Sequence, residues 1–136
     1  RRLGLIMWDY CGMARNAEGL EKARKMVREL RDEFYRDVFI PGNDRDFNPE
    51  LEKAYRVADF LEMGEIMILD AHNRNESCGG HFREEYQDSE GETLRDDENF
   101  KYVAAWEYQD GDAKTAALHK EALNYEFIKI AARNYK

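Results

Sequence analysis

The sequence lacks the features that would place the protein in several special classes. It has only two cysteines, Cys11 and Cys78, which is too few for a disulfide framework, so we expect a reducing compartment. No apolar run approaches the roughly 20 residues of a membrane-spanning helix, and Ile66–Leu69 is only a core patch. There is also no internal repeat and no low-complexity segment. An ordinary folded domain is therefore the expectation.

The sequence also has fewer basic than acidic residues. Lys and Arg number 21 against 29 Asp and Glu, which gives a net charge of −8. Because nucleic-acid binding needs a positive field, we expect no nucleic-acid partner. The 136 residues fit one domain, with 43% hydrophobic residues for a modest core and 37% charged residues for a wet surface.

Three stretches carry apolar residues at spacings of three and four, the pattern of an amphipathic helix. The first helix should end near Gly12 and leaves Trp8 outside its apolar stripe. The second should begin after the N-cap Asn16 and stop before Pro41, and the third begins after Asn48, with a proline at its first position. The three stripes consist of Leu3, Ile6, Met7, Tyr10 and Cys11; of Leu20, Ala23, Val27, Leu30 and Phe34; and of Leu51, Ala54, Tyr55, Ala58, Leu61, Ile68 and Leu69.

The third helix is apolar over much of its circumference, because Val57, Phe60, Met63 and Met67 widen its stripe. A helix of this kind is buried on two sides. The other two helices can cover one side, and we expect an adjoining domain to cover the second. Three helices joined by short links predict an antiparallel three-helix bundle, similar to a spectrin repeat.

The second helix carries a basic face opposite its apolar stripe. We expect this face to be solvent-exposed and salt-bridged, with contact to a partner subunit as the alternative. Pairs such as Glu21–Lys25 and Asp32–Arg36 have the favourable acid-first spacing of four residues. The basic residues are Lys22, Arg24, Lys25, Arg28, Arg31 and Arg36.

The last third of the chain has a different pattern. Residues 88–98 are rich in Asp, Glu and Gly and predict a surface loop. Aromatic and small residues alternate over 100–108, which indicates a strand with one buried aromatic face, and Asp110–Gly111 is a turn signal. The alanines of 115–125 favour a helix, whereas the preceding turn favours a returning strand. We expect an extended or irregular tail over 127–135.

The stretch 73–87 holds the densest set of chemically informative residues, and its centre, residues 76–83, reads E-S-C-G-G-H-F-R. This segment resembles the E-S-R-G-x-H-x-R motif in the C-terminal helical domain of the succinate dehydrogenase/fumarate reductase flavoprotein subunit. Residues 7–16, 95–100 and 103–108 resemble the flanking parts of the same domain, so the resemblance covers essentially the whole chain. Cys78 stands where most members have Arg, so nothing that this Arg does is carried over.

The resemblance implies a mainly α fold: the bundle, a Gly-Gly loop, and then a β-hairpin with an extended tail. It favours the strand over the helix at 115–125. We accordingly divide the chain into residues 1–87, with the bundle and the motif loop, and residues 88–136, with the acidic loop, hairpin and tail packed on the bundle. Because the sequence starts within a helical pattern and without an initiator Met, we expect it to be a piece of a longer chain.

The resemblance also implies a parent oxidoreductase that interconverts succinate and fumarate with FAD. Its electrons pass to an iron–sulfur subunit and then to a membrane quinone-reducing subunit, at the cytoplasmic face of the inner membrane. FAD and the catalytic residues belong to the missing upstream domain. This chain is expected to be inactive alone and to brace the flavin domain, with docking of the iron–sulfur subunit as the alternative. An L-aspartate oxidase-like parent is a further alternative.

The motif residues remain the candidates for a position at a domain junction close to the active site. His81 with Arg83 has the chemistry to bind a dicarboxylate, but pairing with Glu76, Glu84 or Glu85 explains the same residues. A metal site lacks paired ligand spacings, and a nucleophilic cysteine lacks a base other than the nearby histidine. We therefore expect no catalytic, cofactor or metal ligand here. The candidates are Ser77, Cys78, Gly79, Gly80, His81 and Arg83.

Overall fold

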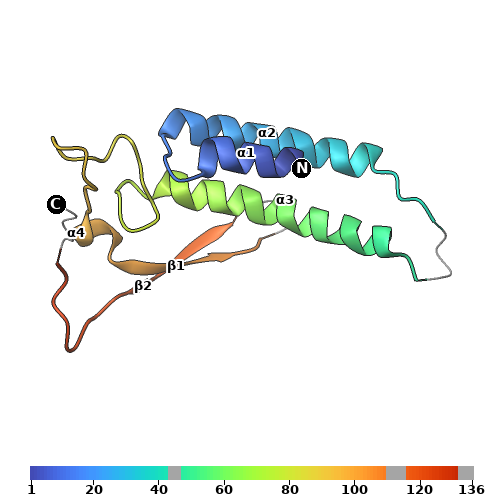
Figure 1. Ribbon diagram of the computed structural model, residues 1–136. Helices are drawn as coiled ribbons and strands as arrows, with labels where there is room; N and C mark the ends of the chain where they lie inside the picture. Colours follow the sequence, from blue (N-terminus) through green and yellow to red (C-terminus); the bar gives the residue numbers. More distant parts are fainter. Residues whose placement is uncertain (43–46, 110–115, 132–136) are drawn as a thin grey trace. The chain divides into compact units, whose positions relative to one another are not determined.

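The structure, a computed structural model, describes residues 1–42, 47–109 and 116–131 (Figure 1). It divides into two compact units, Arg1–Asp96 and Asp97–Lys136. The first unit contains three long or medium helices and the second a short helix and two strands, so the prediction of a mainly helical bundle with a hairpin is confirmed. The elements are α1 (Arg2–Cys11), α2 (Ala17–Asp37), α3 (Pro49–Asn73), α4 (Asp97–Phe100), β1 (Tyr102–Glu107) and β2 (Ala117–Ala122).

Local capping explains where α2 and α3 begin. The side chain of Asn16 accepts a hydrogen bond from the Gly19 amide, at 2.7 Å. The side chain of Asn48 accepts from the amides of Glu50 and Leu51, and Pro49 occupies the first turn of α3. These bonds satisfy amides that have no partner within the helix. Both N-caps predicted from the sequence are therefore confirmed.

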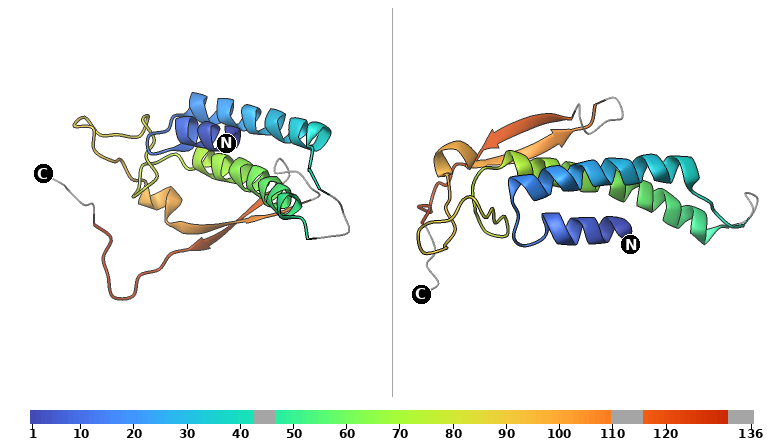
Figure 2. Two further views of the ribbon diagram at one scale, coloured as in Figure 1. Left: turned by 45° about the vertical axis from the view of Figure 1, so that its right-hand side comes forward. Right: turned by 90° about the horizontal axis from the view of Figure 1, so that it is seen from above.

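The core lies where the three helices of the first unit face one another (Figures 1 and 2). α1 packs closely on α3 at Gly64, because a Cβ built there would lie only 3.3 Å from the Leu3 side chain. A Cβ at this position would therefore require the Leu3 side chain to shift by a few tenths of an ångström. The buried apolar residues are Ile6, Cys11, Leu20, Ala23, Val27, Leu61, Ile68 and Ala71.

The basic face of α2 forms salt bridges, as the sequence suggested, but only half of it faces solvent: Lys22, Lys25 and Arg36 are exposed, whereas Arg24, Arg28 and Arg31 are partly buried. Glu65 of α3 is fully buried, and the guanidinium groups of Arg24, Arg28 and Arg31 all converge on its carboxylate. Arg31 also pairs with Glu62, at 3.1 Å. A buried carboxylate is tolerated only with compensating charge, which these arginines supply. Half of the basic face therefore ties α2 to α3.

α3 keeps a broad apolar surface outside the core. Tyr55, Phe60, Met63 and Met67 are each more than half exposed within the first unit, although the sequence pattern had placed Tyr55 in the core stripe. Single exposed apolar residues are common, but a row of them along one helix marks a contact surface. No helix among the described residues has the length and apolarity needed to cross a membrane.

The second unit is built around one antiparallel hairpin. β1 and β2 pair in a register that places Trp106 opposite Leu118 and Tyr102 opposite Ala122. Alternate residues of β1 are half-buried, which matches the predicted alternation, although none of them is fully buried. The helical alternative for 115–125 is wrong, because β2 occupies this stretch. The predicted turn at Asp110–Gly111 lies outside the described residues, as does the end of the tail.

Residues 88–96 form a surface loop, as predicted, but Asp97 and Glu98 already belong to α4. The loop turns at Asp88, whose carboxylate accepts hydrogen bonds from the amides of Glu90 and Glu92. Gly91 has a φ of 82°, in the left-handed region that favours glycine. The Asp88 side chain in this turn is therefore explained by local backbone capping.

Candidate functional site

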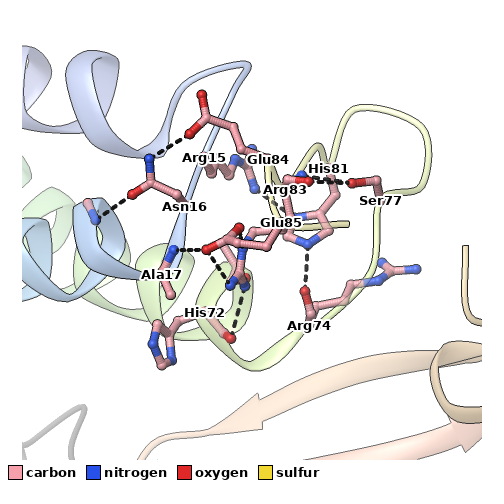
Figure 3. Close-up of polar contacts among 12 residues, drawn as sticks. Arg15, Asn16, Ala17, His72, Arg74, Ser77, His81, Arg83, Glu84 and Glu85 are labelled. Atoms are coloured by element: carbon pink, nitrogen blue, oxygen red, sulfur yellow. Dashed lines mark hydrogen bonds and ion pairs between the residues drawn. The ribbon is translucent and has the colours of Figure 1, made fainter. Parts of the chain in front are cut away.

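The candidate site is the segment between α3 and the acidic loop, residues 74–87, which we name the junction loop (Figure 3). Its tip is a tight turn closed by two backbone hydrogen bonds between Cys78 and His81, of 2.8 and 3.0 Å. Gly79 has a φ of 60°, which other residues adopt only at a cost. The space around Gly79 and Gly80 is open. The first glycine of the motif is thus required by the turn, and the second is not.

Ser77 and Arg83 close the base of this turn. Both residues are buried, with exposed fractions of 0% and 2%. The Ser77 hydroxyl accepts a hydrogen bond from the Arg83 amide, at 2.8 Å, and donates to the Arg83 carbonyl, at 3.1 Å. The Ser77 amide donates to the carbonyl of Leu94. One hydroxyl therefore satisfies both backbone groups of a residue six positions away.

The guanidinium group of Arg83 is directed at the end of α3. It donates to the carbonyls of Ala71 and His72, at 3.0 and 3.2 Å. The last carbonyls of a helix have no partner within the helix and carry partial negative charge. On its other side the group pairs with Glu85, at 3.2 Å. Arg83 is therefore a charged cap for α3 rather than a free cation.

The acids that follow Arg83 bind the start of α2. Glu85 accepts a hydrogen bond from the amide of Ala17, the first residue of α2, and Glu84 accepts one from the side chain of Asn16. Burial alone would raise the pKa of Glu85, but the hydrogen bonds from Ala17 and Arg83 outweigh it, so the pKa lies below its ordinary value. The carboxylate thus stays ionised beside the positive end of the α2 dipole.

A short backbone pairing completes this connection. The Arg15 amide donates to the Phe82 carbonyl, at 3.1 Å, and the Glu84 amide donates to the Arg15 carbonyl, at 2.8 Å. These bonds form a parallel bridge between Arg15 and Arg83. The junction loop therefore joins the end of α3 to the link between α1 and α2.

His81 lies half-buried between Arg15 and Arg74. Its Nδ1 is 3.0 Å from Arg15 Nη1, and its Nε2 is 2.8 Å from the Arg74 carbonyl. A guanidinium only donates and a carbonyl only accepts, so Nδ1 is the acceptor and Nε2 carries the proton. Burial lowers the pKa of His81, and the charges of Arg15, Arg74 and Arg83 lower it further against the opposing effect of the Arg74 carbonyl. The imidazole is therefore neutral at pH 7.

Glu76 fixes the N-terminal end of the junction loop. Its carboxylate is 2% exposed, accepts from the Arg74 guanidinium at 2.7 Å, and accepts from the Asp96 amide at 2.8 Å. A buried carboxylate with both a cationic and an amide donor is well compensated. Glu76 therefore holds the end of the acidic loop against the base of the turn.

This geometry favours pairing within the chain over dicarboxylate binding as the role of His81 and Arg83. The guanidinium of Arg83 is buried and already bonded to carbonyls and to Glu85, so it presents no fork to a dicarboxylate. His81 donates to a backbone carbonyl and accepts from Arg15. Pairing of Arg83 with Glu85 was one of the predicted alternatives, whereas His81 pairs with Arg15 and Arg74 instead of an acid. The side chains of the junction loop thus cap and connect helices.

Two kinds of cofactor-binding arrangement were sought among the described residues, a cluster of metal ligands and a dinucleotide-binding unit. The described residues contain no group of three or more His, Cys, Asp or Glu side chains arranged around a metal position. Their strands are antiparallel, and they form no strand–turn–helix unit with a glycine-rich turn for a dinucleotide pyrophosphate.

Sequence reasoning missed two residues of the site, Arg15 and Arg74. Arg15 lies 66 positions from the histidine that it contacts, and its role depends on the fold of the bundle. Arg74 acts partly through its backbone carbonyl, which no side-chain pattern reveals. Within the motif, Ser77 and Arg83 meet at the base of the turn, while Cys78, Gly79, Gly80 and His81 form its tip.

Comparison with known proteins points to one family. The family described as "Fumarate reductase flavoprotein C-term" matches residues 1–135. The fumarate reductase flavoprotein subunits of a Serratia species and of Escherichia coli are 34% and 33% identical over 94% of this chain. An L-aspartate oxidase of Vibrio cholerae is 33% identical over 67% of it. The chain spans only 19% of the length of each of the two fumarate reductase subunits and 16% of the oxidase.

Solved structures agree with this match. A mutant FrdA chain of E. coli quinol fumarate reductase superimposes with a TM-score of 0.77 and 31% identity, over 95% of this chain and 21% of that chain. A quinol-fumarate reductase solved with menaquinol gives a TM-score of 0.75 at 30% identity, over 93% of this chain and 21% of that one. The chain thus has the fold of a domain found in known structures. The chain belongs to the family of C-terminal domains of fumarate reductase and succinate dehydrogenase flavoproteins.

Proposed function

We propose that this chain is the C-terminal domain of an FAD-dependent flavoprotein that interconverts succinate and fumarate. The observation that carries the proposal is the family match over residues 1–135, together with relatives named as fumarate reductase flavoprotein subunits. FAD, the substrate and the catalytic residues belong to the part of the parent that lies outside this chain. Electrons pass from the parent's flavin to an iron–sulfur subunit and a membrane quinone-reducing subunit, at the cytoplasmic face of the inner membrane, where the parent is peripheral.

The domain's own role in this proposal is to brace the flavin domain. The broad apolar surface of α3 outside the core supports this role, because such a surface is expected to be covered in the whole protein. The junction loop supports it as well, because it fixes the end of α3 to the start of α2 and so keeps this surface rigid. The chain itself carries no catalytic step.

The test is to express the full-length parent without residues 1–136 and to compare it with the intact parent. We expect lower flavin content, slower succinate–fumarate interconversion and a lower melting temperature, because the flavin domain loses the surface that supports it. Normal turnover and normal thermal stability of the shortened parent would contradict a bracing role.

A second function is supported by Trp8. This side chain is 81% exposed on α1, and Leu5, three positions earlier on the same helix, is also exposed. Exposed aromatic residues are typical anchors of protein interfaces. The partner in this alternative is the iron–sulfur subunit. Trp8→Ala in the full-length parent separates the two: lost subunit assembly with normal flavin content supports docking, whereas lost flavin content supports bracing.

The relatives also include L-aspartate oxidases. In an oxidase-like parent, the same domain would brace a flavin domain that acts on L-aspartate and needs no iron–sulfur partner. Measuring turnover of the full-length parent with succinate, fumarate and L-aspartate distinguishes the two substrate classes directly.

A further inference from the structure

The sheet of the second unit has two open edges within the described residues. It contains the strands β1 and β2 alone, side by side, so each strand is hydrogen-bonded along one side only (Figure 1). A two-stranded hairpin is marginally stable in water, whereas a sheet of three or more strands with a hydrophobic face is stable. The hairpin therefore gains stability from a strand that adds to one of its edges.

The backbone groups on the outer edge of β1 can be identified from the register. Lys101 and Leu123 lie opposite each other, because they extend the register of the hairpin by one pair. The Leu123 amide donates to the Lys101 carbonyl, at 3.1 Å, so the two residues form a hydrogen-bonded pair. Hydrogen-bonded pairs alternate along an antiparallel ladder, so Val103 bonds β2, while the amides and carbonyls of Tyr102 and Ala104 face away from it. These outward groups have no hydrogen-bond partner among the described residues.

β1 has none of the features that usually protect an open edge. Natural edge strands carry Lys or Pro, or a bulge that bends the edge away. Residues 102–106 read Y-V-A-A-W, without a charged residue or a proline, and β1 pairs with β2 over six successive positions without a bulge. β2 carries three charged or titratable residues in a row, His119, Lys120 and Glu121. The outer edge of β1 is therefore the edge that is suited to strand addition.

The sequence of β1 is complementary to itself. When a second copy of β1 is placed antiparallel about Ala104, the two Ala104 residues face each other and form a hydrogen-bonded pair. Tyr102 then lies opposite the second copy's Trp106, and Lys101 lies opposite the second copy's Glu107. The side chains of Lys101 and Glu107 are both exposed. Opposite charges directly across two strands stabilise their pairing, and two-fold symmetry makes this contact occur twice.

We propose that the outer edge of β1 is a self-association site, at which β1 of a second copy of the chain adds antiparallel and centred on Ala104. The product is a four-stranded sheet in the order β2–β1–β1–β2. Glu107 can take the second copy's Lys101, because His119 bonds only one of its two carboxylate oxygens, at 2.7 Å. This site goes beyond the proposed function and is the same for either substrate class of the parent.

The experiment compares the full-length parent with its Ala104→Pro and Ala122→Pro variants. Proline removes one amide, and an edge strand tolerates it where that amide faces outward. Ala122 is the matched control, because it lies opposite Tyr102 and its amide faces the outer edge of β2. Sedimentation velocity gives the oligomeric state of each protein from about 1 to 100 μM, and hydrogen exchange of the Val103 amide reports whether the hairpin is kept.

We expect the unmodified parent and Ala122→Pro to dimerise in this range, and Ala104→Pro to dimerise at least about tenfold more weakly. A parent that stays monomeric throughout would overturn the proposal, as would Ala104→Pro dimerising like Ala122→Pro. Flavin content and turnover, measured on the same samples, test the proposed function separately.

A cysteine variant tests the register and keeps every backbone amide. Opposite residues of a hydrogen-bonded pair have Cα atoms about 5.5 Å apart, which a disulfide can span. Oxidised glutathione should therefore link Ala104→Cys into a covalent dimer of the parent, in a yield at least about tenfold above that of Ala122→Cys. Equal yields at the two positions would contradict the pairing about Ala104, whether or not the proline variant keeps its hairpin.

Discussion

Replacing Arg83 by Met tests the junction loop most sharply, because Met keeps an unbranched apolar stem in place of the Arg stem and removes the guanidinium. The Arg83 side chain is 3% exposed and donates to the carbonyls of Ala71 and His72. A hydrogen bond from a charged donor contributes about 1.5–3 kcal/mol. The pair with Glu85 adds little, because that carboxylate is 38% exposed and screened by water.

The expected loss of unfolding free energy is about 3 kcal/mol, near the lower end for two such bonds, because the carbonyls at the end of α3 regain some water. This corresponds to a fall of about 10 °C in melting temperature for a domain of this size. The assay is urea unfolding followed by circular dichroism, with a thermal melt as the second measurement.

Arg56→Ala is the matched control, because Arg56 is an exposed arginine of α3 that pairs only with an exposed acid, Glu52. We expect no measurable change in its unfolding midpoint. If Arg83→Met lost less than about 1 kcal/mol, water would serve the end of α3 as well as the guanidinium does, and the capping argument would be refuted.

Three further predictions concern substitutions at single positions. Gly79→Ala should lower stability by about 1 kcal/mol in urea unfolding because its φ is positive, while Gly80→Ala should be neutral in its open site; equal effects would contradict the turn geometry. Glu65→Gln should cost about 3 kcal/mol, because three arginines lose their shared carboxylate, and an unchanged midpoint would show that they are solvated. Because the pKa of His81 is lower in the folded state than its ordinary value of 6.5, the unfolded chain binds more protons just below pH 6.5. The contribution of His81 to stability is therefore present above pH 6.5 and is lost as the pH falls below that value. Thermal melts from pH 5 to 8 should show that His81→Asn removes this part of the pH dependence.

The parts of the fold that could be predicted from the sequence are those that depend on local chemistry. Asn16 and Asn48 identify two helix starts because an N-cap bonds amides within its own turn. The strand β1 followed from alternation over a few residues. The identity of the domain followed from the resemblance of residues 76–83 to a family motif. The structure shows what three of these residue types do: Gly79 forms a tight turn, Ser77 closes its base, and Arg83 caps a helix.

The parts that could not be predicted depend on how distant elements face one another. The sequence showed the basic residues of α2 but not their convergence on Glu65, because this needs the relative rotation of α2 and α3. Arg15 was missed for the same reason, since its contact with His81 spans 66 positions. Tyr55 was assigned to the core because its spacing fits the stripe, whereas the bundle leaves it 66% exposed. Periodicity gives the faces of a helix but not which face is covered.

The central claim is that a rigid C-terminal domain, held by the junction loop, supports the flavin domain of the parent. The most direct test is the temperature at which flavin is released from the full-length parent, measured by flavin fluorescence for the unmodified protein, Arg83→Met and Arg56→Ala. We predict that Arg83→Met lowers the release temperature in step with the melting of this domain, while Arg56→Ala leaves it unchanged. If flavin release stayed at the unmodified temperature while the Arg83→Met domain had already melted, the flavin domain would not depend on this support, and the claim would be contradicted.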